Sequence, residues 1–130
     1  MQNAFLLNLL ERYDEALAAF ERALDVDPFY VHALVGKSLT LSELGRHHEA
    51  LEMYHRMPEF ATYFAYAWRW KGNVLRRRGR NEEALTAFEQ ALEFDPTFTP
   101  TWVDQEQALR TLNRVREADE AAARLRSLSS

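Results

Sequence analysis

The chain has 130 residues, with 16 lysines and arginines against 20 aspartates and glutamates and no cysteine. This composition excludes a disulfide framework and a thiolate zinc site, and the short, interrupted apolar runs argue against a membrane span. Residues 4–10 are apolar but lack the basic start of a signal peptide, so we expect a soluble, cytoplasmic protein.

Apolar residues recur at helical spacing along the whole chain. The expected helices cover residues 1–11, 13–27, 31–44, 47–57, 65–78, 81–94, 100–112 and 115–125. Gly45 follows the third of these and suits the left-handed backbone at a helix end. Pro58 is expected to end the fourth helix early and to leave residues 59–64 as a bridge to the next one.

The sequence repeats itself with a step of 34 residues. Residues 13–28 read YDEALAAFERALDVDP, and residues 82–96 read EEALTAFEQALEFDP. The same step produces columns of like residues: Ala16, Ala50, Ala84 and Ala118; Arg12, Arg46, Arg80 and Arg114; Glu15, Glu49, Glu83 and Glu117; Leu34, Trp68 and Trp102; Gly45, Gly79 and Asn113. Such a period predicts an array of similar structural units.

The third copy carries a bulky residue, small residues and a turn glycine at Trp68, Gly72, Leu75, Gly79, Ala84, Phe88, Ala91 and Pro96. With these residues the chain resembles the tetratricopeptide repeat family. The resemblance implies an all-α, right-handed superhelical solenoid of about four antiparallel helix-turn-helix repeats. We expect one domain over residues 1–130, with repeats at 1–30, 31–64, 65–98 and 99–128, a truncated first repeat and no separate capping helix. Trp68, Trp102, Phe20, Tyr54 and Phe88 fall at the family's packing positions and are expected in the core.

No motif in the sequence indicates an enzyme. The four glycines are isolated, so no phosphate-binding loop is present. His48 and His55 could share a helix face, but a lone pair at that spacing is more typical of solvated surface than of a metal site. We therefore expect no catalytic residue, no metal and no cofactor.

A basic stretch stands out from the acidic remainder of the chain. Residues 65–81 hold six cations and no acid, whereas the rest carries 10 basic and 20 acidic residues. Such a stretch suits either a solvated helix end or a strip that binds an acidic peptide. Nucleic acid is disfavoured as a ligand of this stretch, because protein domains that bind nucleic acid are usually basic as a whole. Arg80 belongs to the arginine column and is expected to be structural.

In the resembled family, the first helices of the repeats line a concave groove that holds partner peptides. The residues at groove positions are Tyr66, Arg69, Trp70, Asn73, Arg76 and Arg77 in the third repeat, His32, Val35 and Leu39 in the second, and Asp104, Gln107 and Arg110 in the fourth. We expect the arginines to supply positive charge, Tyr66 and Trp70 to supply apolar anchors, and Val35 and Leu39 to form a less polar floor.

Arg69 and Asn73 lie four residues apart and could hold a carboxylate. Chaperone-binding members of the family use a basic residue and an asparagine at this spacing to hold a peptide's C-terminal carboxylate, with a second asparagine in the next repeat. Asp104 takes the place of that second asparagine and would repel a carboxylate. This clamp is therefore at most half present.

The expected function is a non-catalytic protein–protein interaction module that binds an extended or helical, acidic peptide in the groove. The alternative is self-assembly, in which uncapped ends of the array pair to form a homodimer or a longer stack.

Overall fold

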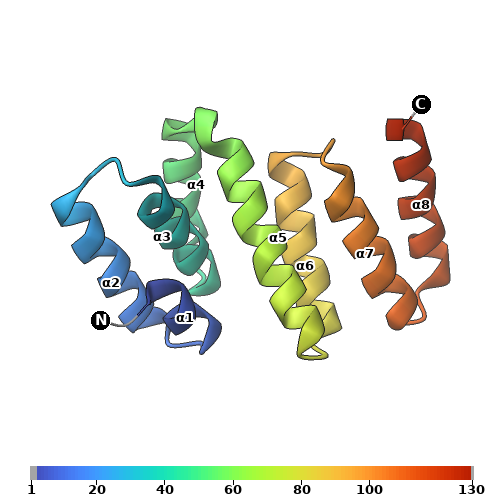
Figure 1. Cartoon of the computed structure of the whole chain (residues 1–130), viewed down its shortest axis with the longest axis horizontal. Coiled ribbons are helices and arrows are strands. Elements are labelled where there is room, and N and C mark those ends of the chain that lie inside the picture. The colour runs from blue at the N-terminus through green and yellow to red at the C-terminus, as the bar shows by residue number, and fades with distance from the viewer. Residues whose placement is uncertain (1–2, 130) are drawn as a thin grey trace. The chain divides into compact units, whose positions relative to one another are not determined.

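The computed structural model describes residues 3–129, which fold into successive antiparallel helices joined by short turns (Figure 1). The elements are α1 (Ala4–Leu9), α2 (Tyr13–Val26), α3 (Val31–Glu43), α4 (His47–Arg56), the 3-10 helix η1 (Pro58–Phe60), α5 (Ala61–Arg77), α6 (Asn81–Phe94), α7 (Thr99–Thr111) and α8 (Val115–Ser129). No strand occurs among residues 3–129, so the predicted all-α fold is confirmed. The chain forms two compact units, which meet in sequence between Tyr63 and Phe64. The single domain expected from the sequence stays a prediction.

Several helix boundaries differ from those expected. α8 continues to Ser129, beyond the expected end at residue 125, and α1 ends at Leu9 rather than at residue 11. Residues 1 and 2 of the first expected helix lie outside the described residues.

The side chain of Asn3 accepts hydrogen bonds from the backbone N–H groups of Phe5 and Leu6, and α1 therefore begins at Ala4. Residues 61–64 were expected to form part of a bridge, but this was wrong, because α5 begins at Ala61. Pro58 ends α4 early as predicted, yet it also starts η1, and the backbone passes from η1 into α5 with a helical residue at Ala61.

The turns between the two helices of each pair share one backbone conformation. Gly45 and Gly79 have φ angles of +80° and +78°, and Asn113 has +61°. These left-handed residues end α3, α5 and α7, as the column of turn residues predicts. Glu11 occupies the equivalent position of the first repeat and also has a left-handed backbone, with a φ angle of +60°. A glutamate at this position gave no indication of that conformation.

The core of the first unit is built on Phe20 of α2. Its ring packs edge-on against Phe5, with the centroids 5.0 Å apart. A Cβ atom on Gly36 of α3 would lie only 2.2 Å from Cζ of Phe20, so this glycine lets α2 and α3 approach closely. Leu7, Ala16 and Ala33 complete the cluster.

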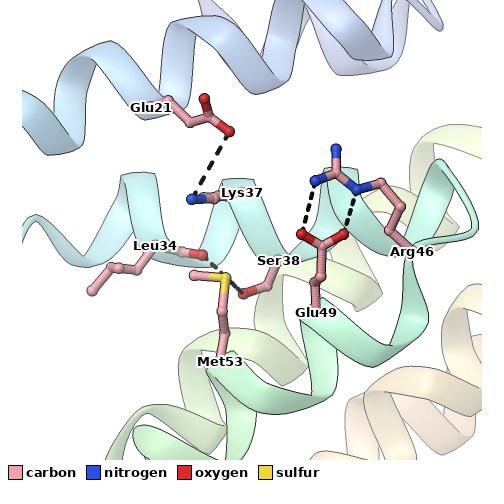
Figure 2. Close-up of polar contacts among 7 residues, drawn as sticks. All are labelled: Glu21, Leu34, Lys37, Ser38, Arg46, Glu49 and Met53. Carbon is pink, nitrogen blue, oxygen red and sulfur yellow. Dashed lines mark hydrogen bonds and ion pairs between the residues drawn. The ribbon is translucent and has the colours of Figure 1, made fainter.

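Polar contacts also join the helices of the first unit, as Figure 2 shows. The hydroxyl of Ser38 on α3 donates to the carbonyl oxygen of Leu34 at 3.0 Å and lies 3.3 Å from the sulfur of Met53 on α4. On the other side of α3, the ammonium group of Lys37 lies 3.9 Å from the carboxylate of Glu21 on α2. Ser38 thus links α3 to α4, and Lys37 links α3 to α2.

The core of the second unit repeats this design with Phe88 of α6, which is fully buried. A Cβ atom on Gly72 of α5 would lie 2.5 Å from Cε1 of Phe88. Phe64, at the start of this unit, packs against Phe94 with ring centroids 5.5 Å apart. Of the five predicted core aromatics, Phe20, Trp68 and Phe88 are buried, whereas Tyr54 and Trp102 are partly exposed.

Each second helix begins with the same arginine–glutamate pair. The four arginines of the repeat column precede α2, α4, α6 and α8, and each donates hydrogen bonds to the glutamate three residues later: Arg12–Glu15, Arg46–Glu49, Arg80–Glu83 and Arg114–Glu117. A carboxylate in the first turn also complements the helix dipole. The arginine and glutamate columns of the repeat thus form one recurring contact, although each exposed pair contributes little to stability.

Among residues 3–129, no helix is long and apolar enough to cross a membrane. The cytoplasmic location expected from the sequence stays a prediction.

Candidate functional site

Most of the predicted groove residues lie in the second unit, on α7 and on the part of α5 from Phe64 onward. On α5 these residues recur at spacings of three and four, which places them on one face of the helix. We call this surface the α5–α7 strip and define it as Tyr66, Arg69, Trp70, Asn73, Arg76 and Arg77 on α5 with Val103, Asp104 and Gln107 on α7.

Asp104 is the centre of a hydrogen-bonded group between the two helices. Nε of Arg69 donates to Oδ2 of Asp104 at 2.6 Å, and Nδ2 of Asn73 donates to the same oxygen at 3.1 Å. Only 10% of the Asp104 side chain is exposed. The two donors that the sequence suggested for a peptide carboxylate are therefore already bound to a carboxylate of the protein itself.

A second link between the helices involves only neutral acceptors. Nη1 of Arg76 donates to Oε1 of Gln107 at 2.5 Å, and Nη2 of Arg76 donates to Oδ1 of Asn73 at 3.2 Å. Arg77, the next residue, is exposed. Neither Arg76 nor Arg77 forms an ion pair with any residue in the described part of the chain. Their positive charges are consequently not neutralised.

Aromatic and apolar side chains border these charges. Tyr66, Trp70 and Val103 are 48%, 38% and 40% exposed, respectively. Phe98, which the sequence reasoning missed, lies edge-on to Tyr66 with ring centroids 5.1 Å apart, and the guanidinium of Arg69 lies 5.6 Å from its ring centroid. Phe98 stands 34 residues after Phe64, and this column could have revealed it. The strip thus combines unneutralised cations with exposed apolar area.

The remaining cations of the basic stretch have different surroundings. Lys71 is buried, with 3% of its surface exposed. Nε of Arg80 donates to Glu83 at 3.0 Å, as expected for a structural residue. Only part of the basic stretch therefore contributes to the strip.

Arg110 on α7 is held by two acids. It forms ion pairs with Glu106 at 2.9 Å and with Asp119 of α8 at 3.2 Å. Donation of hydrogen bonds to Glu106, and then to Asp119, raises the pKa of Arg110 above its ordinary value. Its charge is offset, and it adds little attraction for an acidic ligand.

The groove residues predicted in the second repeat belong to the first unit. His32 is exposed and lies edge-on to Tyr30, with ring centroids 5.6 Å apart. Val35 and Leu39 are only 5% and 1% exposed. They lie in the core of the described structure and do not offer the apolar floor expected for a peptide.

Two family models, both of the tetratricopeptide repeat, match the chain, one over residues 10–63 and the other over residues 65–98. The chain belongs to the tetratricopeptide repeat family. This family is a protein-interaction fold that is generally non-catalytic, and the chain is accordingly a repeat module of the interaction or scaffold class.

Solved structures of other tetratricopeptide proteins are similar in fold. The structure of MamA 41-end from Desulfovibrio magneticus RS-1 has 19% identity and a TM-score of 0.52, and the match covers 97% of this chain and 71% of that one. The structure of TTC0263, a thermophilic TPR protein in Thermus thermophilus, has 24% identity and a TM-score of 0.51, with 96% and 70% covered. At these identities the likeness shows the fold alone. The comparison with curated proteins found no match.

Proposed function

We propose that the α5–α7 strip binds an acidic peptide segment of a partner protein, in extended or helical form, without catalysis. The observation that carries this proposal is the pair Arg76 and Arg77, whose charges no carboxylate in residues 3–129 neutralises. Exposed Tyr66 and Trp70 lie on the same face of α5 and supply the aromatic area typical of interaction hot spots.

In this mechanism, Arg69 and Asn73 organise the strip, and Arg76 and Arg77 attract the ligand. Because Asp104 occupies Arg69 and Asn73, a free C-terminal carboxylate gains no special site there. Amidation of the peptide's C-terminus is therefore expected to change its affinity little. Acidic side chains within the peptide, in contrast, meet the charges of Arg76 and Arg77 directly.

A titration of tryptophan fluorescence with an acidic peptide tests this proposal. The variant Arg76→Gln/Arg77→Gln should lose at least about 1 kcal/mol of binding free energy, or about fivefold in Kd. Arg116→Gln is the matched control, because Arg116 is an exposed arginine of α8 outside the strip, and it should bind like the wild type. Equal affinity in all three proteins would overturn the proposal.

The same titration distinguishes other ligands. Binding should weaken as salt rises, since exposed charges are screened. An oligonucleotide that bound more tightly than the acidic peptide at equal salt would replace the peptide as the ligand class.

Self-association is a second candidate function, favoured by exposed apolar residues in the first unit. Leu6 and Leu10 at α1 are 51% and 52% exposed, and Phe29 is 84% exposed. Leu6 and Leu10 lie four residues apart, which places them on one side of α1, and a contiguous exposed apolar patch is typical of an interaction site. Sedimentation over a concentration series should reveal a dimer that Leu6→Glu/Leu10→Glu dissolves. A wild-type monomer at every concentration would exclude this function.

A further inference from the structure

A continuous network of hydrogen-bonded side chains joins α5 to α7 in the second unit. Asn73 lies in its middle, because its Nδ2 donates to Asp104 at 3.1 Å and its Oδ1 accepts from Nη2 of Arg76 at 3.2 Å. Beyond Asp104 the network ends at Arg69, and beyond Arg76 it ends at Gln107. The network thus holds two guanidinium groups and one carboxylate. Because that carboxylate is paired with Arg69, the remaining positive charge lies on Arg76.

Arg76 differs from several other arginines in the charge of its partners. Carboxylates accept hydrogen bonds from Arg12, Arg46, Arg69, Arg80, Arg110 and Arg114. Arg110 is the most direct comparison, since it lies 34 residues after Arg76 and occupies the same column of the repeat. Two acids offset the charge of Arg110, whereas two amides orient Arg76 and leave its charge in place.

The neighbouring cation, Arg77, has no such support. It is exposed, and it forms no hydrogen bond or ion pair within residues 3–129. A ligand must therefore order its long side chain on binding, which offsets part of the attraction, and salt screens its charge. Arg76 is half-buried and already oriented by two hydrogen bonds. A ligand therefore loses less free energy in ordering Arg76 than in ordering Arg77.

The guanidinium of Arg76 keeps enough donors for a ligand. It carries N–H groups on every nitrogen, and the two amides take one on Nη1 and one on Nη2. The N–H of Nε and a second N–H on each terminal nitrogen remain. A carboxylate accepts two parallel hydrogen bonds from one guanidinium, and such a pair is stronger than a single neutral contact. An aspartate or glutamate side chain therefore matches the donors that Arg76 offers.

We propose that Arg76 is the specificity-determining residue of the α5–α7 strip and binds one aspartate or glutamate side chain of the partner peptide, with Asn73 and Gln107 as its positioning residues. This inference rests on the proposed function, because it assigns the recognition of an acidic side chain to one residue of the same surface. Gln107 orients the guanidinium without pairing its charge. A glutamate at that position would instead pair with Arg76 as Asp104 pairs with Arg69.

Single replacements separate the two cations. The ligand is a glutamate-rich synthetic peptide with blocked ends, and the same peptide with glutamine for glutamate is the neutral control. In the fluorescence titration, Arg76→Gln should weaken binding of the glutamate peptide about fourfold, and Arg77→Gln less than about twofold. Arg76→Lys keeps the charge but not the planar fork, so it should still lose about twofold or more. An equal or larger loss in Arg77→Gln would overturn the inference.

A negative charge at the position of Gln107 tests the positioning role. Gln107→Glu keeps the size of the side chain and should weaken binding about fourfold by pairing with Arg76. Gln90→Glu is the matched control, because it makes the same change on α6, outside the strip, and it should bind like the wild type. In the Arg76→Gln background, Gln107→Glu should have little further effect. Strictly additive losses would mean that the new carboxylate repels the peptide directly, which would overturn the inference.

NMR of the arginine side chains gives a direct reading of the contact in the unaltered protein. The Nε–H resonance of Arg76 should shift during the titration with the glutamate peptide and stay in place with the neutral peptide. If the glutamate peptide binds while this resonance does not shift, the inference is wrong and the proposed function still holds. If the wild type binds the two peptides with equal affinity, both are wrong.

Discussion

The turn between α5 and α6 allows backbone strain to be measured separately from packing. Gly79 has φ +78°, and no atom lies within 4 Å of a Cβ built on it. In Gly79→Ala, the left-handed backbone should cost about 1–2 kcal/mol for a residue with a side chain. The less flexible unfolded chain recovers about 0.4–1 kcal/mol of this. The net loss in free energy of unfolding is therefore expected to be about 1 kcal/mol.

Urea denaturation followed by far-UV circular dichroism measures this loss, which corresponds to a fall in Tm of about 4 °C for a chain of this size. Gly79→Asn is the matched control, because asparagine tolerates the left-handed region and Asn113 holds the equivalent turn with φ +61°. It should lose less than half as much as Gly79→Ala. If alanine costs nothing, or if asparagine costs as much as alanine, strain at this position does not explain the glycine.

Two further predictions concern packing and charge. A Cβ on Gly36 would meet the Phe20 ring at 2.2 Å, so Gly36→Ala should destabilise the protein by about 1–3 kcal/mol through overpacking. Adding Phe20→Leu should recover part of this loss in a double-mutant cycle, whereas strictly additive effects would contradict the contact. The hydrogen bond from Arg46 lowers the pKa of Glu49 below its ordinary value, and Arg46→Gln should raise that pKa in an NMR titration. The contribution of this pair to stability should be present above the unfolded-state pKa of Glu49 and lost as pH falls through its lower folded-state pKa. If the wild type and Arg46→Gln still differed in free energy of unfolding at acid pH, the ion pair would not be the cause of that difference.

The sequence predicted most of the fold because the repeat gives each element several independent indications. The turn at Gly79 was predicted from its column and confirmed by its φ angle. Residues 61–64 were placed wrongly because Pro58 was interpreted only as a helix stop. A proline is also favourable in the first turn of a helical segment, and it begins η1 immediately before α5.

The candidate site was predicted less completely. The repeat register indicated that Arg69, Asn73 and Asp104 occupy related groove positions, but it could not show that Asp104 binds both donors, since this depends on side-chain conformations. Val35 and Leu39 were assigned to the groove from their position alone. The neighbouring residues of α3 are also largely apolar, and a helix that is apolar on most faces is usually buried.

The affinity of the α5–α7 strip for an acidic peptide in the Asp104→Asn variant tests the proposed function most directly. This change removes a negative charge from the strip and releases the charge of Arg69 from its ion pair. We predict that Asp104→Asn binds the acidic peptide about fivefold more tightly than the wild type and binds a neutral peptide of the same length equally well. Unchanged or weaker binding of the acidic peptide by a folded Asp104→Asn variant would contradict the proposal that charge on this strip selects the ligand.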